Sequence, residues 1–81
     1  MARIRKRIKA TVKRVTGGEY DRTRYGTLVW FEADDGDVYL WRTLSHLVGR
    51  FKVGQSVSFT ASTRCTTLNG VRFEVTNPRF S

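Results

Sequence analysis

The first segment of the chain combines strand-like alternation with a dense run of positive charge. Residues 3–14 hold seven basic side chains and no acid. Apolar Ile8, Ala10 and Val12 fall at every second position, which is the period of a β-strand with one buried face. A row of cations on the other face is costly unless an anion lies along it. The cations of that face are Arg3, Arg5, Arg7, Lys9 and Lys13.

The same segment also fits helical spacing. Ile4, Ile8 and Val12 recur at every fourth position, and Val15 follows them. A basic amphipathic helix here would indicate binding to a membrane surface or to a partner. The β-branched residues of the segment favour the strand, which we expect.

Length and charge narrow the class of protein. The 81 residues make one domain, 1–81, with a small core. A hydrophobic content of 40% supports folding and argues against disorder. The net charge of +8 is clustered rather than scattered, which favours a polyanionic partner such as a nucleic acid.

The cysteine content and hydropathy indicate the compartment. Cys65 is the only cysteine, so the chain has no internal disulfide framework and no set of thiols for zinc. No stretch approaches the roughly 18 apolar residues of a membrane span. We therefore expect a cytoplasmic protein without membrane association.

Four further extended segments follow the first, at 24–33, 38–44, 56–64 and 71–76. They are rich in β-branched and aromatic residues and are separated by glycine-containing turns. Residues 45–54 leave room for one helical turn at most, capped by Ser45. The pattern predicts an all-β fold, a five-stranded antiparallel barrel with at most one short helical turn between the third and fourth strands.

The register of the hairpin around residues 35–36 decides which aromatic side chains are exposed. A two-residue turn places Trp30 opposite Trp41 and puts both, with Tyr39, on the outer face, where bases can stack. A three-residue turn with a bulge at its glycine slips the pairing by one and buries Tyr39 and Trp41 beside Phe31. We expect the two-residue turn, and a mixed arrangement with one tryptophan inside and one outside stays open.

The last hairpin shows an internal conflict. A two-residue turn at residues 69–70 pairs Phe73 with Thr66, whereas alternation places these two side chains on opposite faces. We therefore expect a bulge or a local break between Ser62 and Thr67, where a barrel strand bends.

Short motifs of the chain resemble those of the oligonucleotide/oligosaccharide-binding (OB) fold, and of a small OB-like module found in bacteriophage proteins. Val53-Gly54 resembles the entry to the fourth strand of such barrels. The other matching motifs are Tyr25-Gly26, Phe31, Asp35-Gly36, Trp41-Arg42-Thr43 and Asn69-Gly70-Val71.

The resemblance implies binding of single-stranded nucleic acid across the second and third strands and the adjoining loops. Little sequence specificity is expected, and the phage setting favours DNA and DNA replication in the host cytoplasm. Binding of RNA, as by a basic barrel of the translation-factor type, stays open as an alternative. The sequence does not decide the oligomeric state. The candidate binding residues are Arg3, Arg5, Arg7, Lys9, Lys13, Arg22, Arg24, Tyr25, Trp30, Tyr39, Trp41, Arg42, Arg64 and Arg72.

A different class of function fits the same aromatic surface. Arginine, tryptophan and tyrosine are enriched at protein interfaces, so a phage-type interaction module that docks on a host or viral protein, such as a replication protein, is the alternative. An enzyme is not expected, because His46 is the only histidine and Cys65 has no candidate base near it in sequence. We expect neither a metal site nor a cofactor.

Overall fold

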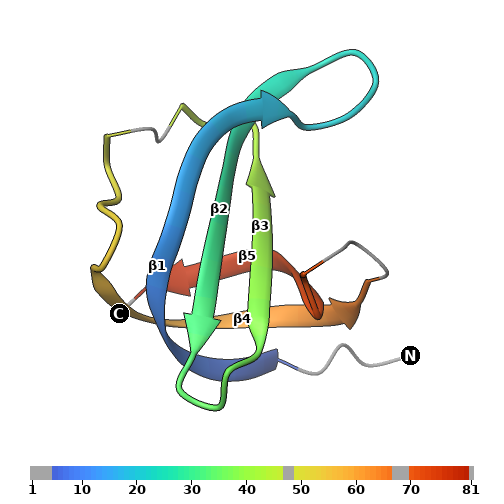
Figure 1. Cartoon of the computed structure of the whole chain (residues 1–81). Coiled ribbons are helices and arrows are strands. Elements are labelled where there is room, and N and C mark those ends of the chain that lie inside the picture. Colours follow the sequence, from blue (N-terminus) through green and yellow to red (C-terminus); the bar gives the residue numbers. More distant parts are fainter. Residues whose placement is uncertain (1–4, 47–48, 67–69, 81) are drawn as a thin grey trace.

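The computed structural model describes residues 5–46, 49–66 and 70–80. Within these ranges it contains five strands and no helix. They close into a barrel in the order β1-β2-β3-β5-β4 (Figure 1). Arg3 and Ile4, part of the expected helical turn (residues 47–48) and Asn69 of the expected last turn lie outside the described residues. The strands are β1 (Arg5–Glu19), β2 (Tyr25–Ala33), β3 (Val38–Thr43), β4 (Ser56–Cys65) and β5 (Phe73–Phe80).

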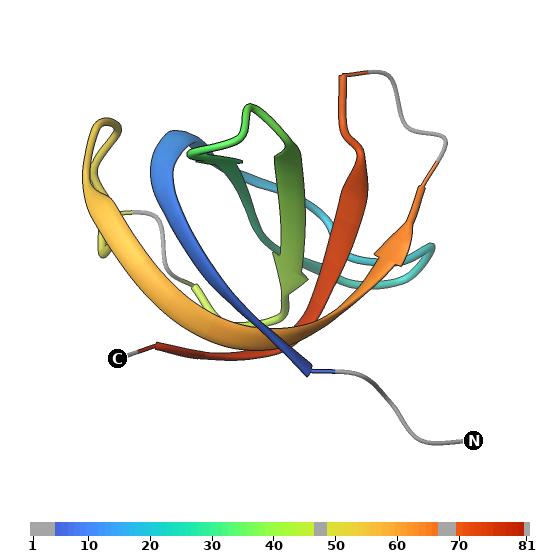
Figure 2. The ribbon, with the colours of Figure 1, turned by 90° about the horizontal axis from the view of Figure 1, so that it is seen from below.

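The basic opening segment forms one long strand, β1, which pairs with two other strands. The first part of β1 pairs with β4, from Arg5 to Thr11, and the later part pairs with β2, from Ala10 to Glu19. The strand interpretation is therefore confirmed over the helical one. β1 curves strongly along its length, and β4 wraps one side of the barrel (Figures 1 and 2).

A bulge marks the bend of β1. Val12 faces Phe31 but Arg14 faces Trp30, so Lys13 is the extra residue. The main chain before the bulge is held by the connector to β4, since Val12 N–H donates to the Gln55 carbonyl at 2.9 Å and Gly54 N–H donates to the Val12 carbonyl at 2.8 Å. Because the bulge reverses the alternation, Arg14 points to the outer face with Trp30.

The expected five-stranded all-β barrel is confirmed. Four of its five pairings are antiparallel, and β3 runs parallel to β5 from Tyr39–Phe73 to Trp41–Val75. β5 thus lies between β3 and β4, and β4 returns to β1 to close the barrel.

The inner faces of the strands supply an apolar core. Phe31 and Phe59 are fully buried, with ring centroids 5.0 Å apart. Phe51 of the connector packs edge-on against Phe31, with centroids 6.3 Å apart. Burying one such side chain stabilises the fold by about 1.5–3 kcal/mol, which makes this ring cluster a main source of stability. The buried β1 positions are Ile8, Ala10 and Val12, as alternation predicts.

The hairpin between β2 and β3 has a three-residue turn, so the expected two-residue turn is wrong. Gly36 N–H donates to the Ala33 carbonyl, and Ala33 N–H donates to the Asp37 carbonyl, both at 2.9 Å. Gly36 has φ +90°, the conformation of a glycine bulge that follows a type I turn. The pairing slips by one residue, and Phe31 faces Tyr39.

The irregularity of the last hairpin lies on β5. Between the pairs Thr60–Arg79 and Ser62–Thr76, β5 has one residue more than β4. Asn77 takes a positive φ of 49° there, and the strand continues through Pro78 rather than ending at it. No register shift occurs in β4 beyond Ser62 within the described pairing, so the bulge expected between Ser62 and Thr67 is not found there.

Gly26 is predicted to be irreplaceable for steric reasons. A Cβ built on it would lie 1.9 Å from the Thr43 carbonyl oxygen and 2.9 Å from the Leu44 Cα, which are main-chain atoms. We expect Gly26→Ala to lower the free energy of unfolding by about 1–3 kcal/mol or more, as overpacking does, measured by urea denaturation.

Gly17 of the same hairpin provides the matched control. A Cβ there would meet its nearest atom, the Gly26 carbonyl oxygen, at an ordinary 3.8 Å. We expect Gly17→Ala to leave the stability unchanged or to raise it by up to about 1 kcal/mol. Equal losses in the two variants would contradict the steric explanation.

Candidate nucleic-acid interface

The outer face of β2 and β3 carries apolar side chains that the barrel interior does not use. Trp30 faces Leu40 across the two strands, and Leu28, two residues before Trp30 on β2, lies on the same face. Leu40 is only 3% exposed and Val71 only 8%. A cleft of about 640 Å³ opens over these residues. Its lining residues are Glu19, Tyr20, Asp21, Arg22, Leu28, Trp30, Leu40, Arg42 and Val71.

A second cleft, of about 610 Å³, meets the first at Tyr20 and Arg42. It runs between the end of β3 and the bulged part of β5, and Trp41 and Pro78 are among its walls. The two clefts are neighbours that share wall residues, and we call them together the β3 groove. Its mixed apolar and basic lining suits a chain-like ligand rather than a small compact one.

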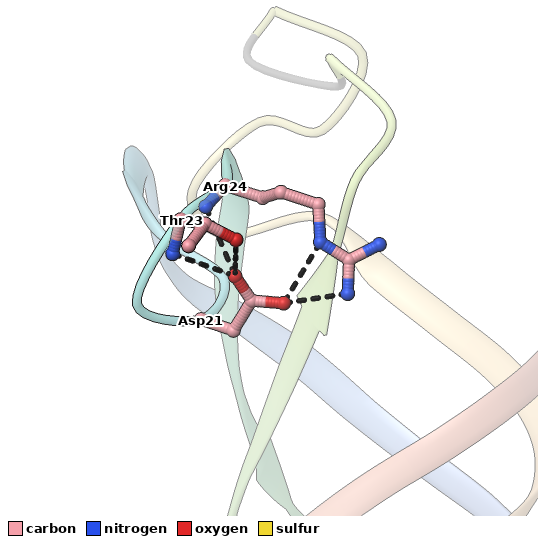
Figure 3. Close-up of polar contacts among 3 residues, drawn as sticks. All are labelled: Asp21, Thr23 and Arg24. Atoms are coloured by element: carbon pink, nitrogen blue, oxygen red, sulfur yellow. Dashed lines mark hydrogen bonds and ion pairs between the residues drawn. The ribbon is translucent and has the colours of Figure 1, made fainter.

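Asp21 organises the loop between β1 and β2 at one wall of the groove (Figure 3). Its Oδ1 accepts hydrogen bonds from the backbone N–H groups of Thr23 and Arg24, both at 2.9 Å. Its Oδ2 accepts from Arg24 Nε at 2.8 Å and from Nη2 of the same guanidinium. The Arg24 side chain first, and the Thr23 backbone next, lower the pKa of Asp21 from 3.8 to about 2.

Two aromatic rings of the groove are each covered by an arginine. The Arg14 guanidinium carbon lies 5.1 Å from the Trp30 ring centroid, and that of Arg24 lies 5.2 Å from the Tyr20 ring centroid. Cation–π contacts of this kind are worth about 0.5–1 kcal/mol at exposed sites. They hold Arg14 against Trp30 and Arg24 against Tyr20, two rings that line the groove.

Arg42 lies where the two clefts meet. Glu74, whose side chain is 17% exposed, holds it by an ion pair with an Nε–Oε1 distance of 3.4 Å. The Arg42 Nε is buried and makes no hydrogen bond within the described structure, because the contact with Glu74 is an ion pair without hydrogen-bond geometry. Glu74 also accepts a hydrogen bond from Arg64 Nη2 at 3.1 Å. One carboxylate thus orients two cations beside the groove.

The aromatic residues expected to form an exposed platform are divided by the observed register. Trp30 lies on the outer face at the groove, as expected. Tyr39 is 1% exposed, and its ring stacks on Phe73 with centroids 5.2 Å apart, so it belongs to the core and offers no face to a base. Trp41 lies on the inner face, half-buried against Phe51 and Phe80, and reaches only the rim of the groove.

Tyr25, at the start of β2, is 72% exposed but does not line the β3 groove.

Several expected cations around the barrel are paired with acids. Lys13 pairs with Glu32 at 3.0 Å, and Arg72 pairs with Asp37 at 3.9 Å, in addition to Arg24, Arg42 and Arg64. Arg22 lines the groove and has no acidic partner among the described residues.

Arg5, Arg7 and Lys9 do not line the β3 groove, although β1 was expected to run beside the aromatic residues. They point outward on the part of β1 that pairs with β4.

The sequence did not single out Arg14 or Glu74 as site residues. Alternation alone placed Arg14 on the inner face, and only the bulge at Lys13 brings it to Trp30.

Comparison of the chain with known protein families, curated proteins and solved structures finds no match. In the part of the chain that the structure describes, no three histidine, cysteine or acidic side chains gather as metal ligands would. A search of the same residues finds no helix with the length and hydropathy of a membrane span. The site is therefore interpreted from its own geometry.

The lowered pKa of Asp21 predicts an acid-sensitive loop. Because the folded-state pKa lies below the ordinary 3.8, the charged carboxylate stabilises the loop above that pH, and this contribution is lost as the pH falls toward about 2. We expect a carboxyl NMR titration of Asp21 with a midpoint of about 2, and faster amide exchange of Thr23 and Arg24 over the same range. Asp21→Asn should remove this pH dependence, and its persistence in that variant would contradict the assignment.

Trp41 is predicted to matter for stability. Its ring packs against Phe51 and Phe80 with centroids 6.2 and 5.5 Å away. We expect Trp41→Ala to cost about 3 kcal/mol of unfolding free energy, the lower end for truncating a large core aromatic, because the ring is only partly buried. Tyr25→Ala, at an exposed position, should change stability by no more than about 0.5 kcal/mol. A stable Trp41→Ala variant would contradict the inward register.

Proposed function

We propose that this protein is an OB-like barrel that binds single-stranded nucleic acid in the β3 groove, with little sequence specificity. The observation that carries the proposal is the groove itself, where Trp30 and Tyr20 meet Arg14, Arg22 and Arg42. The groove involves the β2–β3 face, the β1–β2 loop and Val71 from the connection between β4 and β5. These are the elements that OB-folds use for oligonucleotides, and the barrel is compatible with such a fold.

The chemistry of the groove fits a strand rather than a single base. Stacking of a base on an aromatic side chain contributes about 1–3 kcal/mol and tolerates any base, because every base has a flat face. Arg22 has no acidic partner among the described residues, which leaves it available to a phosphate. Arg42 is oriented by Glu74 and adds a cation at the middle of the groove.

The proposed contacts differ from those expected from the sequence. Trp30, Arg22 and Arg42 are retained, Tyr20 of the β1–β2 loop, which the sequence offers as a further stacking residue, is included, and Arg14 is added. Tyr39 is omitted because it is buried. The motifs that resemble a phage module make single-stranded DNA the first ligand to test and DNA replication the first process to examine.

Trp30 provides the test. We expect Trp30→Ala to weaken binding of a labelled oligothymidine about 5- to 150-fold at low salt, the equivalent of losing one stacked base. Trp30→Phe should keep most of the affinity, because a flat ring remains. Fluorescence anisotropy of the oligonucleotide measures both.

Val53→Ala is the matched control, since Val53 is 69% exposed in the connector and lines neither cleft of the β3 groove. Its affinity should equal that of the unaltered protein. If the unaltered protein does not bind single strands at low salt, the proposal is wrong, and the interaction module that docks on another protein becomes the explanation to pursue.

A further inference from the structure

The basic residues at the start of β1 lie on a different outer face from the β3 groove. This face is formed by β1, β4 and β5, which lie next to one another in the barrel (Figure 2). Its centre is Thr60, which faces Arg7 on one side and Arg79 on the other. We call it the Thr60 face. Its outward residues are Arg5, Arg7, Lys9, Ser56, Thr60, Ser62 and Arg79; Ser58 lies in the same row of β4, but its hydroxyl is buried.

Three arginines converge on Thr60. Arg7 and Arg79 are its direct neighbours in the register, so the two lie about 10 Å apart across β4. Arg5 crosses the face, because its Nη2 donates to the Thr60 carbonyl at 2.8 Å and to the Asn77 carbonyl at 3.0 Å. The Asn77 carbonyl belongs to the bulge of β5, and the bulge therefore helps to hold a guanidinium over this face.

Three cations of the Thr60 face are not neutralised by an acid among the described residues. Within the described structure, Arg7, Lys9 and Arg79 form no ion pair, whereas Lys13, Arg24, Arg42, Arg64 and Arg72 each have one. Asp34 and Asp35 share a pocket of about 370 Å³ with Arg7 and Lys9 but do not pair with them. Charges about 8–10 Å apart are only partly screened at physiological salt, so these cations repel one another.

The other side chains of this face are hydroxyls. Alternate residues of one strand are about 7 Å apart, which is close to the repeat between successive phosphates of an extended polynucleotide. Hydroxyls and arginines are the side chains that contact phosphate oxygens without reading bases. No aromatic ring lies among the outward residues, so base stacking is not available here.

We propose that the Thr60 face binds the sugar–phosphate backbone of the nucleic acid beyond the segment held in the β3 groove. This inference rests on the proposed function. β1 then connects the two surfaces. Arg7 and Lys9 of the Thr60 face precede the bulge at Lys13, and Arg14, which contacts Trp30 of the groove, follows it on the same strand. The nucleic acid leaves the stacking groove along β1 and continues over Thr60 by charge alone.

Oligonucleotide length separates the two surfaces. An oligothymidine of about 4 nucleotides suffices for the groove, and one of about 16 nucleotides, the upper end for one OB-fold, reaches the Thr60 face as well. For Arg7→Gln/Arg79→Gln we expect unchanged affinity for the short oligothymidine. For the long one the log–log salt slope should fall by about 1.4, or about 0.7 for each phosphate that is no longer neutralised.

Arg50→Gln/Lys52→Gln is the matched control, because it removes the same charge from exposed connector residues. It should leave the slope for the long oligothymidine unchanged. An equal fall in this control, a weaker affinity of Arg7→Gln/Arg79→Gln for the short oligothymidine, or a slope that this variant does not change would each overturn the inference. If the unaltered protein binds neither oligothymidine, the proposed function itself fails, and the inference fails with it.

Discussion

The double pairing of β1 is the constraint on which the rest of the structure depends. One strand pairs with β4 from Arg5 to Thr11 and with β2 from Ala10 to Glu19, and the bulge at Lys13 lies within its pairing with β2. The bulge turns Arg14 to the outside, where it covers Trp30. The inner face keeps Ile8, Ala10 and Val12 in the core. Closure of the barrel and the position of Arg14 at Trp30 therefore both depend on β1, through its pairing with β4 and its bulge at Lys13.

Charge is distributed unequally over this small barrel. The acids are used mainly to fix arginines and lysines in place, as Glu74 does for Arg42 and Arg64, and Asp21 for Arg24. Cations without an acidic partner in the described structure include those of the Thr60 face and Arg22. The net charge of +8 is therefore spread unevenly over the surface. Acids orient cations beside the aromatic groove, and unpaired cations lie on β1 and β5 of the described structure.

Much of the architecture could be predicted from the sequence, because alternation in β1 and the Asp35-Gly36 turn are strong local signals. Register was harder, since a turn of two residues and a turn of three fit the same letters. Only burial of Tyr39 against Phe73 distinguishes them, and this contact depends on the parallel pairing of β3 with β5. The bulge at Lys13 is equally invisible in sequence, so Trp30 was expected at the site while its partner Arg14 was not. The binding roles proposed for the site residues stay predictions until binding is measured.

Closure of the sheet has a consequence for self-association. In an open sheet the outermost strands expose unpaired backbone groups, which invite further strands and aggregation. Here every strand of the described barrel has a neighbour on both sides. Backbone groups open to a further strand are therefore confined to stretches with a single neighbour, such as Lys13 to Glu19 of β1, which pair with β2 alone among the described strands.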